Sequence, residues 1–258
     1  MKISLERKVA LITGGSRGIG AATVRLFHSA GAQVAFNYHS NQQAAEKLLR
    51  ELGTDRVAAF QCDLSAPEPA QQLVDQTVAR FGRVDVLVAN HGVWPPADVP
   101  VETMTEEQWC GTVAINLDSV FGLIKHAVAQ MKRQSRVGAI AGKIVLISST
   151  AGQRGEAFHC DYAATKGALI SMTKGLATEL ASSGIYVNCV APGWVATEMA
   201  GPALNDPKTR ETIQRAIPLG RPGTPEEIAA PVLFLCSDHA NFITGEICNV
   251  NGGAVLVG

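Results

Sequence analysis

A tyrosine and a lysine offer a proton donor for chemistry at a carbonyl group. The segment Tyr162-Ala-Ala-Thr-Lys166 begins a run of helical period, and its i, i+4 spacing puts the phenol and the ammonium on one face of a helix. A free tyrosine has a pKa of about 10, and a neighbouring ammonium favours the phenolate. We therefore expect Lys166 to lower the pKa of Tyr162 toward the working range of a general acid. Ser149 follows a strand-like run at 143–148, so its hydroxyl is expected to face the same crevice.

A glycine-rich turn lies near the N-terminus and reads Gly14-Gly15-Ser16-Arg17-Gly18-Ile19-Gly20. It follows an apolar run at 9–13 and precedes a helical pattern. Glycine tolerates positive φ and lets the backbone approach a pyrophosphate, while a helix N-terminus directs its free amides at the anion. The glycine spacing is one residue wider than the G-x-G-x-x-G fingerprint of dinucleotide-binding folds. Alone, the turn indicates a phosphate site without identifying the ligand.

Two other motifs also place a glycine-rich turn between a strand and a helix. Residues 14–18 also match G-x-S-x-G, the nucleophile elbow of α/β-hydrolases, with Ser16 as nucleophile. Such a hydrolase needs an acid and then a histidine downstream, whereas the best-placed histidine, His159, has its acid after it. A Walker A loop is excluded because no Gly-Lys-Ser/Thr follows the glycines. The hydrolase stays open as an alternative.

The end of the second expected strand bears on the choice of cofactor. NAD-binding sites usually place an acid there to hold the ribose hydroxyls. In this chain the strand runs into Tyr38-His39-Ser40-Asn41, without an acid. Arg17 in the glycine turn offers a bidentate cation for a 2′-phosphate, which a carboxylate would repel. We therefore predict that NADP(H) is preferred over NAD(H); a solvated surface role for Arg17 is the alternative.

Short runs rich in Val, Ile and Leu alternate with longer helical segments, as in a parallel sheet covered by helices on both faces. Strands are expected at 9–13, 33–37, 57–61, 84–89, 143–148, 185–190 and 246–250. Helices are expected near 18–30, 41–52, 67–81, 105–134, 160–182 and 225–236. The chain is thus predicted to be an α/β protein with a single domain, residues 1–258. Its core would be a Rossmann-like, doubly wound, parallel seven-stranded sheet.

The stretch 192–224 is the least regular part of the chain and carries five prolines. It follows the sixth expected strand, where ligands of open α/β sheets bind. We expect a mobile lid over the site, with a plain surface excursion as the alternative.

Composition describes an ordinary globular chain. The 22 basic and 23 acidic residues are nearly balanced, which argues against a nucleic-acid binder with a basic face. The six cysteines form no C-x-x-C pair, so no zinc or redox motif is encoded, and core packing of reduced thiols is expected. Residues 1–8 are polar, and no apolar run reaches the roughly 20 residues of a membrane span. We expect a cytoplasmic protein that binds neither membranes nor nucleic acid, and no metal.

These motifs together resemble the short-chain dehydrogenase/reductase family, in its subgroup with chains of this length. The resemblance spans the chain, and its parts follow the family's order. They are the turn from Thr13 to Gly20, Asp63, Asn90-x-Gly92, Asn116, Ser149, Tyr162 with Lys166, and Pro192-Gly193. Within the family the chain is similar to 3-oxoacyl-[acyl-carrier-protein] reductases and to the sugar dehydrogenases close to them.

The resemblance implies a role for each matching residue in carbonyl reduction and alcohol oxidation. Ser149 would hydrogen-bond the substrate carbonyl and Tyr162 would protonate its oxygen. Lys166 would hold the nicotinamide ribose, and Asn116 would anchor a water that passes protons to Lys166. Contacts to the cofactor would come from Gly14, Ser16, Arg17, Gly18, Ile19, Gly20, Tyr38, Asp63, Leu64, Asn90, Gly92, Tyr162, Lys166, Pro192, Gly193, Val195 and Thr197. Among these, Asp63 and Leu64 would contact adenine.

Three departures from the family pattern bear on the substrate and on one cofactor contact. The family more often shows Asn-Asn-Ala-Gly where this chain has Ala89-Asn90-His91-Gly92. We expect His91 to point to solvent, with intrusion on the cofactor as the alternative. Carrier-protein reductases usually present a basic residue before the sixth strand, but 181–184 reads Ala-Ser-Ser-Gly; the basic run 132–136 is followed by an apparent insertion at 137–142. Sugar, polyol or other carbonyl substrates therefore stay open.

Two further expectations concern metals and assembly. His159, Cys160 and Asp161 could imitate a metal cluster, but adjacent side chains cannot converge on one ion, so they are placed on the rim of the substrate pocket. The long helices at 105–134 and 160–182 and the uncharged C-terminal segment carry more apolar surface than one globule needs. The resemblance implies that these parts pair between subunits in a homotetramer, with a monomer as the alternative. A sensor that binds NADP without turnover is a different class of function; the intact Ser149, Tyr162 and Lys166 argue against it.

Overall fold

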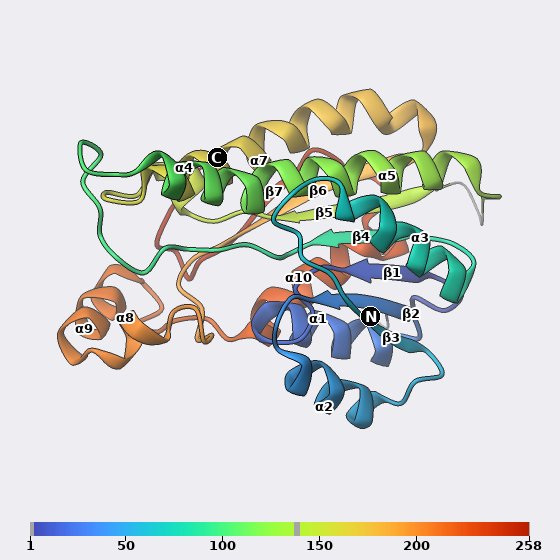
Figure 1. Ribbon diagram of the computed structural model, residues 1–258, viewed down its shortest axis with the longest axis horizontal. Helices are drawn as coiled ribbons and strands as arrows, with labels where there is room; N and C mark the ends of the chain where they lie inside the picture. The colour runs from blue at the N-terminus through green and yellow to red at the C-terminus, as the bar shows by residue number, and fades with distance from the viewer. Residues whose placement is uncertain (1–2, 137–139, 258) are drawn as a thin grey trace.

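The computed structural model describes residues 3–136 and 140–257 and shows one parallel sheet in its centre (Figure 1). The strand order is β3-β2-β1-β4-β5-β6-β7, with every neighbouring pair parallel. The strands are β1 (Val9–Ile12), β2 (Gln33–Tyr38), β3 (Val57–Gln61), β4 (Val86–Ala89), β5 (Gly142–Ile147), β6 (Ile185–Pro192) and β7 (Ile247–Val250). Each lies within two residues of its predicted bounds, and the central strands β1, β4 and β5 are buried along their whole length, as expected of apolar runs in a parallel sheet.

Helices cover both faces of the sheet, as predicted. One layer packs α1 (Gly18–Ser29), α2 (Gln42–Leu52) and α10 (Pro225–Cys236) on a core that includes Phe27, Leu48 and Val232. The other layer packs α3 (Pro69–Phe81), α5 (Ser119–Arg133) and α7 (Cys160–Leu180) on a second core around Leu73 and Leu123. Figure 1 shows α5 and α7 above the sheet and α1 and α2 below it. Two apolar cores on opposite faces confirm the doubly wound architecture.

The prediction of a single helix over 105–134 is wrong in one respect. The structure has α4 (Glu106–Val113), a π-helical segment (Ala114–Asp118) and then α5. A π-bulge adds a residue to one turn, so it rotates the side chains that follow and often marks a functional site. Asn116 lies in this segment and is fully buried.

The segment 192–224 is more regular than expected, because two of its prolines begin or nearly begin helices. It contains α8 (Gly201–Asn205), with Pro202 in its first turn, and α9 (Pro207–Ala216). Proline is well suited to the first helical turn, where the missing N–H is not needed. Backbone hydrogen bonds between Trp194 and Gly223 and between Ala196 and Gly223, both 2.9 Å, close the base of this excursion. Figure 1 places it beyond the ends toward which the strand arrows point; its mobility stays a prediction.

The expectation that the cysteines pack in the core as reduced thiols is confirmed only in part. All six are free thiols, and Cys62, Cys189 and Cys236 are buried, but Cys110 on α4 is exposed. Of the part of the chain that the structure describes, no helix has the length and apolar character needed to cross a membrane. The structure does not describe 137–139, where half of the apparent insertion lies.

Candidate active site

Three chemically active side chains meet where β5 ends and α7 begins. Ser149 follows β5, and Tyr162 and Lys166 lie in the first turns of α7. The Lys166 Nζ lies 5.7 Å from the centre of the Tyr162 ring and donates a 2.9 Å hydrogen bond to the Ile147 carbonyl oxygen. The Ser149 hydroxyl is hydrogen-bonded to Tyr162. The structure thus brings together the residues that the sequence indicated for proton transfer.

The expectation that Lys166 lowers the pKa of Tyr162 is wrong, since this pKa is raised. Burial raises the pKa of Tyr162 to about 12, against the opposing hydrogen bond from Ser149, and the nearby carboxylate of Glu156 raises it further. Burial also lowers the pKa of Lys166 to about 8. The physical reason is that desolvation penalises both charged forms. Moreover, the ammonium faces the Tyr162 ring and the Ile147 carbonyl.

The loop that follows β4 holds the Asn116 side chain close to Lys166. Its Oδ1 accepts a 2.8 Å hydrogen bond from the Val93 amide, and its Nδ2 donates to the Val93 carbonyl at 2.9 Å. A Cβ at Gly92 would lie 3.0 Å from Asn116 Oδ1 and 3.4 Å from Lys166 Nζ. Gly92 therefore marks a point where backbone, amide and ammonium approach closely. The proton-passing role that the resemblance implies for Asn116 stays a prediction.

The glycine turn has the shape of a phosphate cradle. Gly14 and Gly18 have φ of +62° and +53°, which side-chain-bearing residues rarely adopt. The side chain of Asn37, at the end of β2, accepts a 2.8 Å hydrogen bond from the Gly14 amide. The first turn of α1 has no side-chain cap, so its amides stay available to an anion. The turn fits a dinucleotide pyrophosphate.

The residues expected at the adenine end surround the ends of β2 and β3. Tyr38 ends β2 and Leu64 is buried after β3. The exposed Asp63 carboxylate lies 3.6 Å from His39 Nε2. Arg17 is exposed and pairs with Glu198 at 2.9 Å. An ion pair this exposed contributes little to stability, so Arg17 can exchange Glu198 for a phosphate at little cost.

The nicotinamide end is expected along the segment that follows β6. The Pro192 carbonyl accepts a 2.9 Å hydrogen bond from the Thr150 amide, and the Gly193 amide donates to Val250 at 3.1 Å. Val195 is buried, and the Thr197 side chain faces Gly18, at 3.3 Å from the position of a Cβ there. The segment therefore reaches the glycine turn at the carboxyl ends of the strands.

His91 does not point to solvent, so that expectation is wrong. Its Nδ1 lies 2.8 Å from the Thr13 hydroxyl and its Nε2 lies 2.7 Å from the Ser119 hydroxyl. Thr13 and Ser119 are both fully buried, so the ring points into the protein although His91 as a whole is partly exposed.

The rim position predicted for His159 and Asp161 is also wrong, since both are buried. The His159 Nε2 is hydrogen-bonded to the Pro95 carbonyl at 2.9 Å. Asp161 accepts a 2.8 Å hydrogen bond from Thr112, which ties α7 to α4. Among the described residues, no cluster could hold a metal ion.

Sequence reasoning missed a group of residues beside Tyr162. Trp94 stacks on His159 at 4.9 Å and meets Trp194 edge-on at 6.0 Å. The Trp94 indole donates a 3.2 Å hydrogen bond to Glu156, whose pKa is raised by burial. The sequence signal that could have indicated this group is Glu156, an acidic residue between Ser149 and Tyr162. Trp94, Trp194 and Glu156 form what we call the aromatic wall of the site.

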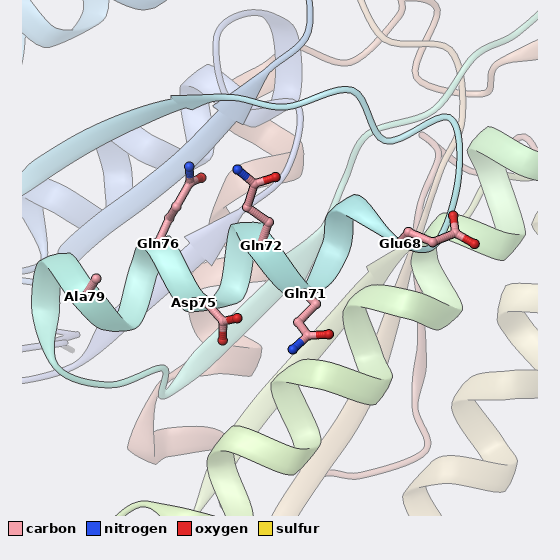
Figure 2. Close-up of a pocket in the computed structure, with 6 residues that line it drawn as sticks. All are labelled: Glu68, Gln71, Gln72, Asp75, Gln76 and Ala79. Carbon is pink, nitrogen blue, oxygen red and sulfur yellow. The ribbon is translucent and has the colours of Figure 1, made fainter.

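A separate hollow lies on α3 and is unrelated to this site. Figure 2 shows side chains of one helix around it, and none of the residues implicated above takes part. They are Glu68, Gln71, Gln72, Asp75, Gln76 and Ala79.

The doubly wound sheet, the glycine cradle and the Ser–Tyr–Lys group define a nicotinamide-dependent oxidoreductase that interconverts a carbonyl and an alcohol. The family model described as enoyl-(acyl carrier protein) reductase matches residues 14–255. The chain belongs to the short-chain dehydrogenase/reductase family.

Similar proteins and structures agree with this assignment. An acetoacetyl-CoA reductase of Shinella zoogloeoides is 39% identical over 97% of this chain and 99% of its own. A 3-oxoacyl-[acyl-carrier-protein] reductase of Chlamydia trachomatis is 37% identical over 96% of this chain and 98% of its own. The crystal structure of a short-chain dehydrogenase/reductase of the glucose/ribitol dehydrogenase type from Brucella melitensis has a TM-score of 0.90. Its sequence is 35% identical, and the match covers both chains completely.

Proposed function

We propose that this protein reduces a 3-oxoacyl thioester with NADPH, the acyl group being carried by an acyl carrier protein or by CoA. The observation that carries the proposal is the Ser149–Tyr162–Lys166 group beside Asn116. Relatives named for such substrates align over nearly the whole chain. The hydrolase alternative has less support, because the best-placed histidine, His159, is buried and hydrogen-bonded to the Pro95 carbonyl.

The residues divide the work on the substrate between them. Ser149 donates a hydrogen bond to the substrate carbonyl oxygen, which polarises the carbonyl and aligns it with Tyr162. Tyr162 donates its proton to the same oxygen as negative charge develops there. Lys166 holds the nicotinamide ribose and supplies a positive charge near Tyr162. When bound, the nicotinamide cofactor supplies or accepts the hydride.

We expect NADPH to be preferred over NADH by at least about tenfold in kcat/KM, or about 1.4 kcal/mol. The reason is that no acid ends β2 and that the exposed Arg17 can exchange its partner Glu198 for a 2′-phosphate. Tyr38→Asp is expected to weaken NADPH and favour NADH, because it supplies the missing acid. Tyr38→Asn is the matched neutral control and should keep the NADPH preference. Equal use of both cofactors by the unmodified protein would contradict the assignment.

A hydroxylated substrate such as a sugar or polyol is the second candidate, and Glu156 in the aromatic wall favours it. Glu156 places a half-buried carboxylate near Tyr162, with only 22% of its side chain exposed. A carboxylate accepts hydrogen bonds from hydroxyl groups, whereas the alkyl chain of an acyl thioester offers none. Leaving this carboxylate against an alkyl chain costs free energy.

A substrate panel distinguishes the two candidates. NADPH is tested with acetoacetyl-CoA and an acyl-pantetheine mimic, and NADP⁺ with glucose and ribitol. If the thioester is the substrate, the thioester arms are expected to give the higher kcat/KM. Glu156→Gln should then change the KM for acetoacetyl-CoA by less than about threefold. Turnover of only the hydroxylated compounds, with a KM raised about tenfold in Glu156→Gln, would reject the thioester and support the second candidate.

The homotetramer and the cytoplasmic location stay predictions. Assembly through α4, α5 and α7 has support in exposed apolar side chains on the first two helices, Trp109 and Phe121. Leu256, in the uncharged C-terminal segment, is also exposed.

A further inference from the structure

His91 touches two hydroxyl groups that come from different parts of the fold. Thr13 follows β1 and begins the glycine turn, while Ser119 is the first residue of α5. Both are fully buried, and they lie 2.8 and 2.7 Å from the two nitrogens of the ring. The His91 residue as a whole is partly exposed, but both ring nitrogens are paired with buried hydroxyls, which fixes the orientation of the ring.

The hydrogen bonds determine which nitrogen carries the proton. Ser119 donates its own hydroxyl proton to the Ile115 carbonyl at 2.7 Å, so its oxygen accepts from His91 Nε2–H. The unprotonated Nδ1 then accepts from the Thr13 hydroxyl. Burial, aided by the charge of Lys166, lowers the pKa of His91 to about 3, which keeps the ring neutral near pH 7. The direction of the chain of hydrogen bonds is therefore constant.

The Thr13 branch leads to the phosphate cradle. The Thr13 hydroxyl oxygen accepts hydrogen bonds from the backbone amides of Asn90 and His91, at 3.0 and 3.2 Å. A Cβ at Gly14 would lie 3.1 Å from the His91 Cα. This branch therefore joins the glycine turn to the loop that contains Asn90 and Gly92.

The Ser119 branch leads to the proton-transfer group. Its acceptor, Ile115, lies in the π-helical segment and directly precedes Asn116. Asn116 in turn contacts the Val93 backbone and the Thr165 hydroxyl, next to Lys166. One imidazole ring thus connects the segment that holds Asn116 with the turn that would hold the pyrophosphate.

We propose that His91 is a positioning residue that joins the cofactor cradle to Asn116, so that its Thr13 branch sets cofactor affinity and its Ser119 branch sets kcat. The inference rests on the proposed cofactor site and not on the identity of the carbonyl substrate. It also explains a histidine where the resembled family more often has alanine: alanine would leave both hydroxyls without the ring.

Side-chain length allows the two branches to be removed separately. Asparagine places an oxygen where His91 has Nδ1, and glutamine places an amide nitrogen near the position of Nε2. His91→Asn therefore keeps the Thr13 branch, His91→Gln keeps the Ser119 branch, and His91→Ala keeps neither. Ser119→Ala removes the second branch without changing the loop. Thr77→Ala is the control, because it removes one buried hydrogen bond from α3, which lies outside the site.

The experiment measures the Kd of NADPH and of NADH by cofactor fluorescence, kcat with acetoacetyl-CoA or a small diketone, and Tm. For His91→Ala we expect the NADPH Kd to rise and kcat to fall, each by about tenfold. His91→Asn should restore the Kd but not kcat, and His91→Gln should restore kcat but not the Kd. Ser119→Ala should lower kcat at unchanged Kd, and Thr77→Ala should lower only Tm.

The proposal is overturned if the His91 variants lower Tm and leave both Kd and kcat unchanged, as the control does. It is also overturned if Asn and Gln restore both quantities equally. Should His91→Ala fail to fold, the Asn, Gln and Ser119→Ala variants still decide. Equal binding of NADH and NADPH by the unmodified protein would reject the proposed cofactor preference, and the comparison among variants would still test His91.

Discussion

Tyr162→Phe is expected to reduce turnover by at least about a hundredfold, within the 10² to 10⁴ range typical of a lost general acid. The substitution removes only the hydroxyl that protonates the substrate oxygen and keeps the ring beneath Lys166. Cofactor affinity should therefore change little, since the glycine turn and Asn37 are untouched. Single-turnover kinetics and a fluorescence titration separate the two quantities.

The chain provides a matched control in a second tyrosine. Tyr186 lies on β6 with its ring near Lys143, outside the active site, so Tyr186→Phe should keep wild-type turnover. More than about a tenth of wild-type turnover in Tyr162→Phe would show that another group protonates the substrate. A similar loss in both variants would point to a general effect on folding.

Gly20→Ala is expected to weaken NADPH binding by at least about a hundredfold, which corresponds to about 2.7 kcal/mol. Gly20 packs so tightly that an added Cβ would overlap the Gly14 carbonyl oxygen and lie 2.8 Å from the Asn90 side chain. The neighbouring atom is backbone and belongs to the cradle itself, so the methyl group can be accommodated only by moving the turn. The Kd and Tm of the variant are the measurements.

Gly111→Ala is the corresponding control in another helix. Gly111 lies in α4, where an added Cβ meets nothing within 4 Å, so alanine should stabilise the helix by up to about 1 kcal/mol. Its NADPH Kd should stay at the wild-type value. An unchanged Kd in Gly20→Ala would exclude the tight packing of the turn as the basis of cofactor binding.

The hydrolase alternative has its own test. If Ser16 were a nucleophile, Ser16→Ala would abolish hydrolytic activity.

The sequence alone was sufficient to predict the sheet, its parallel strands and the grouping of the residues proposed for catalysis. Fully apolar strands and amphipathic helices are local patterns, and Tyr162 and Lys166 are one helical turn apart, so their proximity follows from geometry. Ser149 could be placed with them because the carboxyl ends of parallel strands share one edge of the sheet.

Only the tertiary structure decided the state and surroundings of those residues. The pKa of Tyr162 depends on burial and on Glu156, and no local pattern gives the burial of a side chain at a helix start. His91 lies between Thr13 and Ser119, which are distant in sequence, so its inward direction could not be inferred from its neighbours. The break of one long helix by a π-helical segment was also hidden, because the apolar period continues through it. Local spacing determines which groups can act together, whereas packing between distant segments determines their charge and orientation.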